Sequence, residues 1–259
     1  MLNIRPDQIA VFEQAALQNF EDRMLAHLKN FAPNHSKILS EDELRVVIRH
    51  GMKQAESHGF TSERSLRIYT ELMLMLGAGF DSDPQLQWVA ELLKDETITD
   101  EVTRIDRLQE RAWAYVDDVL PDFDNTEDES SPNSFIEQIR QLQRERAEVL
   151  QPAAIAEFYQ RTMWQLKQAL PRKCELLGEQ SLRRLVNSGI QLARSYQITT
   201  ERGCAFFVTG IFLLGSGFDK DPQLPWIAKI LNDTSMSGEK AKVDRLLVEA
   251  IDCIKRFRH

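Results

Sequence analysis

One stretch of this chain occurs twice, and the second copy begins 138 residues after the first. Residues 76–88 read LGAGFDSDPQLQW, and residues 214–226 read LGSGFDKDPQLPW. The same offset, without a gap, aligns Phe20 with Phe158, Gly51 with Gly189, residues 61–64 with 199–202, and residues 106–108 with 244–246. A long internal repeat predicts two similar structural units before any single element is assigned.

The repeat divides a chain of 259 residues into two units of ordinary domain size. We expect a first helical repeat at residues 1–119 and a second at residues 135–259. Between them, residues 120–134 are rich in acidic residues, serine and proline, which is typical of a linker or an exposed loop. Only 11 glycines and 9 prolines occur in the chain, which favours long regular elements.

Apolar residues at helical spacing predict a helix over residues 7–31, ended by Pro33, and a counterpart that ends at Pro171. Before that counterpart, residues 135–150 have strong helical propensity, with Pro152 near a break. Ser40 followed by Glu43 is a capping box and predicts the start of a second helix.

The second helix of each unit carries a glycine, Gly51 or Gly189, in its middle. Glycine there costs about 1 kcal/mol relative to alanine, so its presence in both copies indicates a close crossing of two helices.

The third helix is the most apolar of each unit, and we expect it at the centre. Thr61 and Thr199 are its predicted N-caps, and Gly77 with Gly79, or Gly215 with Gly217, is predicted to end it.

A fourth helix is predicted to start at Asp83-Pro84 and at Asp221-Pro222, with Asp as N-cap and Pro at the first helical position. A fifth amphipathic stretch follows in each unit, and alternating β patterns are absent from the sequence. The predicted fold class is all-α: two tandem repeated helical bundles of about five helices each.

Composition limits the classes of partner. The net charge of −8 and the lack of a basic stripe argue against nucleic acid and against anionic membranes. The longest apolar run, residues 205–214, is half the length of a membrane span, and the N-terminus has no signal-peptide pattern. Three cysteines form neither a disulfide framework nor a zinc spacing. We therefore expect a cytoplasmic protein with reduced, buried cysteines.

The repeated motif GFDxDPQLxW supplies the residues that could form a site. A functional interpretation makes its Asp pairs cation ligands, since Asp-x-Asp opens a calcium loop, but the later acids and the mid-loop glycine are missing. A structural interpretation assigns the motif to a helix stop, a tight turn and an anchoring Phe. A third, compatible interpretation is a docking surface on both halves. The candidate partner-binding residues are Phe80, Asp81, Asp83, Trp88, Phe218, Asp219, Asp221 and Trp226.

No pattern of catalytic residues stands out. The chain has no GxSxG, P-loop, Rossmann GxGxxG or HExxH motif, and none of the first four histidines has a histidine counterpart in the second copy. We predict no catalytic residues, no metal ligands and no cofactor, and hence a protein that is not an enzyme. Trp113 and Trp164 are possible exposed anchors for a partner.

The assembled pattern is a helix stopped by proline, a capped helix ending near Gly59, Thr-x-Glu-Arg opening an apolar helix, and LGxGFDxDPxLxW. It resembles a group of small helical bacterial proteins encoded beside type VI secretion effector, PAAR-tip and chaperone genes, here as two fused copies over about residues 7–119 and 145–257. The resemblance implies a non-enzymatic adaptor or co-chaperone that binds a type VI effector or its chaperone. The alternative it implies is an immunity protein that binds and neutralises a toxin. It carries over no catalytic residues.

Overall fold

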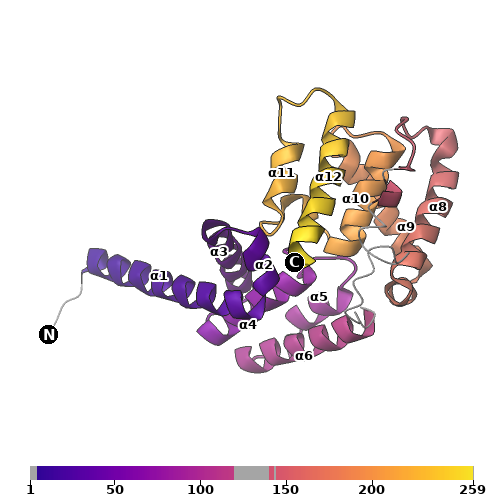
Figure 1. Ribbon diagram of the computed structural model, residues 1–259. Helices are drawn as coiled ribbons and strands as arrows, with labels where there is room; N and C mark the ends of the chain where they lie inside the picture. Colours follow the sequence, from indigo (N-terminus) through magenta and orange to yellow (C-terminus); the bar gives the residue numbers. More distant parts are fainter. Residues whose placement is uncertain (1–4, 120–139, 143, 259) are drawn as a thin grey trace.

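The computed structural model describes the chain except for residues 1–4, 120–139, 143 and 259 (Figure 1). The helices of the first half are α1 (Pro6–Phe31), α2 (Pro33–Ile38), α3 (Glu41–Ser57), α4 (Glu63–Leu76), α5 (Gln87–Leu93) and α6 (Glu101–Val119). Those of the second half are η1 (Pro152–Ala154), α8 (Ile155–Ala169), α9 (Pro171–Ser195), α10 (Glu201–Leu214), η2 (Phe218–Lys220), α11 (Pro225–Leu231) and α12 (Glu239–Arg258).

The described residues contain no strand, and their β-type pairing is limited to an isolated bridge between Val149 and Thr200. The prediction of an all-α chain is therefore confirmed. The predicted linker at residues 120–134 lies outside the described residues. No helix in the described ranges is long and apolar enough to cross a membrane.

The helices of the two halves recur at the spacing of the sequence repeat. α4 and α10 begin at Glu63 and Glu201, and α5 and α11 begin at Gln87 and Pro225, so both pairs lie 138 residues apart. The C-terminal part of α9 corresponds in sequence to α3, and it begins after a bend at Gly178, where φ is 70°.

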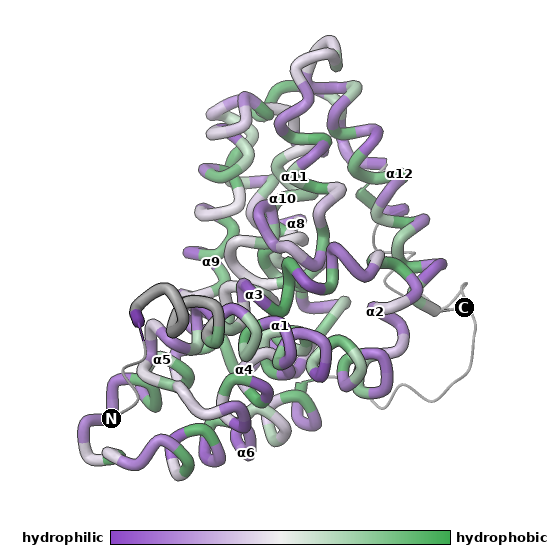
Figure 2. The backbone as a smooth tube through the Cα atoms, turned by 90° about the vertical axis from the view of Figure 1, so that its left-hand side faces the viewer, coloured by the Kyte–Doolittle hydropathy of each residue, from purple (hydrophilic) through white to green (hydrophobic). Residues whose placement is uncertain are grey.

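Each half has a hydrophobic core of its own. One cluster of buried residues comes from positions 20–112, and the other comes from positions 142–250. Equivalent positions have equivalent burial: Ile48 and Val186 are fully enclosed, as are Leu108 and Leu246. Hydrophobic and hydrophilic residues alternate along α6 and α12, because each of these helices turns one face toward its core (Figure 2).

Local sequence signals explain several of these elements. The capping box of α3 is confirmed, since the Glu43 N–H donates to Ser40 Oγ and the Ser40 N–H donates to the Glu43 carboxylate. The close crossing at Gly51 and Gly189 is also confirmed. A Cβ on Gly51 would lie 2.7 Å from Thr70 Oγ1, and a Cβ on Gly189 would lie 2.7 Å from the Cα of Val208.

The predicted N-caps of the central helices were wrong by one residue. Ser62 caps α4 and Thr200 caps α10. Thr61 instead gives its N–H to the carboxylate of Glu101, which starts α6, and that carboxylate also accepts the N–H of Ser62. A carboxylate from a helix forty residues later thus decides where the central helix begins.

The predicted start of the fourth helix was also wrong. α5 begins at Gln87 and α11 begins at Pro225, so Asp83 and Asp221 lie in turns before the helices and do not cap them. Both carboxylates make hydrogen bonds to the opposite half of the molecule, which draws them away from the helix ends.

The three cysteines are buried and unpaired, as expected: Cys174, Cys204 and Cys253. Trp113 and Trp164 are exposed, with 44% and 61% of their surface accessible. Their use as anchors for a partner stays a prediction.

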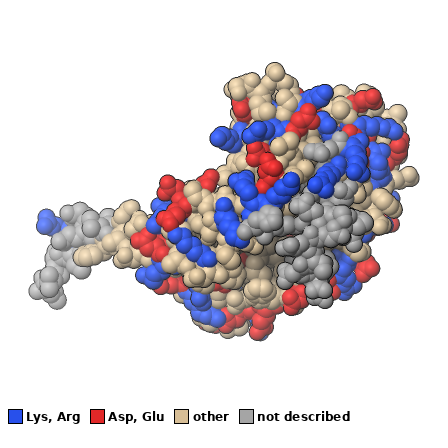
Figure 3. Space-filling model, viewed as in Figure 1, with Lys and Arg blue, Asp and Glu red and all other residues tan. Residues whose placement is uncertain are grey.

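The N-terminal part of α1 projects from the body of the protein as an arm (Figures 1 and 3). Phe12 on this arm is 67% exposed and Leu17 is 39% exposed. No such arm occurs among the described residues of the second half. Its α8 begins after Pro152, and residues 146–150, for which helix was the expectation, are extended. Residues 135–139 lie outside the described part of the chain.

Candidate functional site

The repeated loops begin where the central helices end. Gly77 is the C-cap of α4 with a φ of 96°, and Gly215 is the C-cap of α10 with a φ of 93°. Glycine suits these positive φ values because it has no Cβ to clash with the backbone. The prediction that glycine ends both helices is confirmed, and from these residues each loop runs along the other.

Two aspartates join the loops by reciprocal hydrogen bonds. Asp221 Oδ2 accepts the N–H of Ala78 at 2.9 Å, and Asp83 Oδ2 accepts the N–H of Ser216 at 2.8 Å. Donor and acceptor in one bond are each 138 residues from their counterparts in the other. The two bonds are therefore related by an approximate twofold axis that passes between the halves.

Two glutamines repeat the same exchange. Gln223 Nε2 donates to the carbonyl oxygen of Met73 at 3.0 Å, and Gln85 Nε2 donates to that of Ile211 at 2.7 Å. The carbonyls belong to α4 and α10, so each glutamine binds the central helix of the opposite half. We call residues 77–85 and 215–223 together the joint.

The backbones in the joint pass too closely for larger residues. A Cβ on Gly77 would lie 2.3 Å from the carbonyl oxygen of Leu214, and one on Gly79 would lie 2.5 Å from that of Ser216. Distances below about 3 Å require the neighbour to move, and here the neighbour is backbone. The repeated glycines are thus needed for the contact between halves as well as for the turn.

The first aspartate of each motif binds within its own half. Asp81 Oδ2 accepts Tyr69 OH at 2.7 Å and lies 2.9 Å from His58 Nε2, while Asp219 Oδ2 accepts Tyr196 OH at 2.6 Å. Burial raises the pKa of Asp81, but the hydrogen bonds from His58 and Tyr69 together outweigh it and hold the pKa below its ordinary value. Asp81 therefore fastens its loop to the middle of α4 and to the C-cap of α3, and Asp219 fastens its loop to the C-cap of α9.

The remaining motif residues are aromatic and pack inside the chain. Phe80 and Phe218 are each 1% exposed, and Trp88 and Trp226 are half-buried. All eight candidate partner-binding residues lie together at or beside the joint, and five of them are buried: Phe80, Asp83, Phe218, Asp219 and Asp221.

The two aspartates of one motif diverge, because Asp81 binds its own half and Asp83 binds the other. Across the described ranges, no group of three or more His, Cys, Asp or Glu side chains is placed to hold a metal ion. The hydrogen bonds of these carboxylates give them a structural role in the joint.

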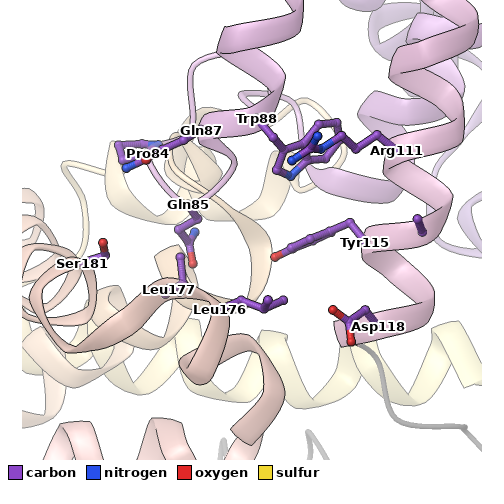
Figure 4. Close-up of a pocket in the computed structure, with 11 residues that line it drawn as sticks. Pro84, Gln85, Gln87, Trp88, Arg111, Tyr115, Asp118, Leu176, Leu177 and Ser181 are labelled. Carbon is purple, nitrogen blue, oxygen red and sulfur yellow. The ribbon is translucent and has the colours of Figure 1, made fainter.

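A cavity of about 370 Å³ lies beside the joint, between the first half and the start of α9 (Figure 4). We call it the seam pocket, and it is lined by Pro84, Gln85, Gln87, Trp88, Arg111, Ala114, Tyr115, Asp118, Leu176, Leu177 and Ser181. The side chains of Gln85, Tyr115 and Leu176 converge on it from three directions (Figure 4). Both halves of the chain are needed to form this pocket.

The seam pocket has polar atoms that the protein leaves unused. Gln85 Oε1, Trp88 Nε1 and Tyr115 OH are buried and have no hydrogen-bond partner. The Arg111 guanidinium lies 5.7 Å from the centre of the Trp88 ring. Burial raises the pKa of Tyr115, and the nearby charge of Asp83 adds to the effect, so the phenol keeps its proton. The pocket therefore has apolar walls and three lining residues that each carry a buried polar atom without a hydrogen-bond partner.

The twofold-related place on the other side of the joint is filled. There α2 packs against α12, and the ring of His35 meets the ring of Phe257 edge-on at 5.2 Å. The sequence counterpart of α2 is residues 171–176, which form the beginning of α9. On this side Leu176 is 48% exposed, and the space beside it is the seam pocket. A second, more open cavity of about 780 Å³ lies beside the other loop of the joint, at Ser216, Gly217, Asp219 and Lys220.

Sequence reasoning missed a buried lysine beside the joint. Lys173 Nζ donates to the carbonyl oxygen of Phe212 at 2.5 Å, near the C-terminal end of α10. Burial lowers the pKa of Lys173 to about 8, against a smaller opposing effect of Asp83 and Cys174. Its position in the repeat corresponds to His35, so the repeat itself held no signal for a buried cation.

Lys173 makes stability depend on pH in a defined direction. Its pKa is about 8 in the folded chain and 10.5 as the ordinary value, so between these pH values the unfolded chain binds more protons. We expect the free energy of unfolding to rise from pH 8 to pH 10.5 relative to Lys173→Met, by on the order of 1–3 kcal/mol. Urea unfolding of both proteins across this range measures the difference, and parallel pH profiles would contradict it.

Comparison of the chain with family models, with curated proteins and with solved structures found no match.

Proposed function

We propose that this protein is a non-enzymatic adaptor, and that its partner is a type VI secretion effector or the chaperone of such an effector. The resemblance of its repeated motif supports the identity of the partner. The seam pocket supports binding as the activity, and it is the observation that carries the proposal. We also propose that the halves are two fused copies of one helical bundle of about five helices, in line with their recurring helix boundaries.

The polar residues of the motif favour binding over chemistry. Asp83, Asp221 and the glutamines beside them hold the halves together, and Asp81 holds its loop. A group that turns over substrate has to reach it, and these side chains are already engaged inside the chain. What they build is a scaffold that keeps two rigid halves in one arrangement.

The seam pocket fits an anchoring residue of a protein partner. Its walls are aromatic and aliphatic, and interface anchors are often single large side chains that fill such pockets. A buried donor or acceptor without a partner costs about 1–3 kcal/mol, so a bound segment that these side chains turn to meet would recover part of this cost at Tyr115, Trp88 and Gln85. Both halves line the pocket, so the proposed binding site requires the fused pair.

A charge in the pocket tests this proposal. Leu176→Glu is expected to weaken binding of the effector or its chaperone at least tenfold, because it places a carboxylate at an apolar wall that the partner must cover. Val102→Glu is the matched control, since Val102 is similarly exposed at 45% but lies outside the pocket. Binding is measured by titration of purified proteins.

Two outcomes would end the proposal. If the wild-type protein binds neither the effector nor its chaperone at micromolar concentration, it is not an adaptor for them. If Leu176→Glu and Val102→Glu bind equally well, the seam pocket is not the binding site. Co-expression separates the alternative of an immunity protein, because an immunity protein rescues cells from the toxin and an adaptor raises effector level or secretion without rescue.

A further inference from the structure

An extended segment covers one corner of the second half, where α8 meets the first turn of α10. The N–H of Arg202 donates to the carbonyl oxygen of Arg146 at 3.0 Å, and the N–H of Glu201 donates to that of Glu148 at 2.9 Å. These amides belong to the first turn of α10, where a helix has no partners of its own for its N–H groups. The segment therefore completes the hydrogen bonding of the helix start.

Side chains also fasten this segment. Glu145 accepts Arg161 Nε at 3.0 Å and Gln165 Nε2 at 2.7 Å, and Leu150 is buried with 3% exposure. Beneath the segment, Arg161 pairs with Glu201 at 2.6 Å, and their side chains are 27% and 4% exposed. At this corner, the segment that carries Glu145 and Leu150 therefore covers the ion pair of Arg161 and Glu201.

The first half has the same corner without a cover. Arg23 and Glu63 are the counterparts of Arg161 and Glu201, and they form the same pair at 2.5 Å. Their side chains are 57% and 69% exposed. The pair in the second half lies beneath the segment, and the pair in the first half is far more exposed. We call the surface of Arg23, Glu63 and Arg64 the open corner.

The chain contains a second sequence that fits the cover. Residues 7–16 read DQIAVFEQAA, and at the repeat offset they align with residues 145–154, ERAEVLQPAA. The acidic residue that binds arginine, the valine of the β-bridge, the apolar anchor and the Ala-Ala pair all have counterparts. Phe12 takes the place of Leu150, yet it is 67% exposed on the projecting arm.

One residue accounts for the different conformations. Pro152 lies where the first half has Gln14. Proline lacks an N–H and clashes with the preceding helical turn, so a helix can begin at Pro152 but cannot continue back through it. Gln14 imposes no such break, and α1 continues to Pro6. The arm is helical because the break is missing, although its sequence matches the cover.

We propose that the open corner is a docking site for the chain's own residues 7–16, which leave α1 and lie over it in the extended form of residues 145–154. In this closed state Phe12 is buried and the first two amides of α4, those of Glu63 and Arg64, are bonded to arm carbonyls. In the open state, Phe12 on the arm is 67% exposed and the side chains of Arg23 and Glu63 are 57% and 69% exposed, so both the arm and the corner are accessible to other molecules. This proposal about the open and closed states of the arm is independent of the proposed adaptor function.

Introducing a proline at position 14, the counterpart of Pro152, tests whether the arm docks. We expect Gln14→Pro to slow hydrogen exchange of the Glu63 and Arg64 amides at least tenfold relative to wild type, and Phe12→Asp added to Gln14→Pro to abolish the protection. In the wild-type protein, deletion of residues 1–16 should speed exchange at the same two amides, since it removes the closed state. Exchange at the equivalent Glu201 and Arg202 amides is the internal reference and should stay constant.

Three results would overturn the proposal. Gln14→Pro could shorten the helix without protecting the two amides, which would show that the arm does not dock. The deletion could leave their exchange unchanged, so that the wild-type arm never covers the corner. Protection that grows with protein concentration would assign the corner to the arm of a second copy.

Discussion

Gly77→Ala is expected to lower the free energy of unfolding by more than about 3 kcal/mol. Gly77 has a φ of 96° and a ψ of 155°, a region almost restricted to glycine, where another residue costs about 1–3 kcal/mol. The new Cβ would also lie 2.3 Å from the carbonyl oxygen of Leu214, and forcing atoms into a packed contact typically costs a further ~1–3 kcal/mol. Chemical denaturation of the wild-type and variant proteins measures the loss.

Gly217→Ala is the control for Gly77→Ala. Gly217 lies in the second loop of the joint with a φ of 83°, but a Cβ there would meet nothing within 4 Å. Only the backbone strain remains, and about 1–2 kcal/mol is expected. Equal losses for the two variants would show that the halves do not approach each other at Gly77.

Asp221→Ala is expected to cost about 3–5 kcal/mol, because each backbone N–H that it leaves buried without an acceptor costs about 1–3 kcal/mol. Asp221 is 4% exposed and accepts the N–H of Ala78 and both the N–H and the Nε2 of Gln223. Alanine leaves the backbone N–H groups of Ala78 and Gln223 buried without an acceptor, while Gln223 Nε2 keeps its bond to the carbonyl oxygen of Met73. Asp83→Ala should have an effect of the same size, because its carboxylate makes the reciprocal bonds to Ser216 and Gln85.

The control for this pair is Asp233→Ala. Asp233 is only partly buried, and its carboxylate accepts the N–H and the hydroxyl of Ser235, two residues away, so less than about 1 kcal/mol is expected. Urea midpoints of the three variants provide the comparison. If Asp221→Ala were as mild as Asp233→Ala, the hydrogen bonds across the joint would contribute little to holding the halves.

Signals confined to a few residues were readable from the sequence. Ser40 and Glu43 predict a helix start because both partners lie within one turn, and Gly77 predicts a helix end because a positive φ is a local property. Gly51 and Gly189 predict a close crossing because a costly residue recurs in the same place of both copies.

Features that depend on residues far apart in the chain could not be predicted from the sequence. Thr61 was chosen over Ser62 as N-cap because nothing nearby reveals the carboxylate of Glu101, forty residues later. Asp83 was assigned to a helix start because the amide it binds, that of Ser216, is 133 residues away.

The repeat contains a signal for the contacts that form the joint. Motif residues that are polar and recur in both copies, such as Gln85 and Gln223, are candidates for contacts across a twofold axis. The seam pocket had no such signal, because it arises where the two halves pack differently: α2 packs against α12, whereas the corresponding residues 171–176 leave Leu176 48% exposed beside the pocket.

The most direct measurement of the joint is hydrogen exchange of the Ala78 and Ser216 amides. Neither amide bonds within a helix, and each donates to an aspartate of the opposite half. We expect both to exchange as slowly as the core of α10, and Asp221→Ala to accelerate Ala78 far more than Ser216. Exchange of both amides at the rate of an exposed loop in the wild-type protein would contradict the account, because the repeated loops would then not hold the two halves together.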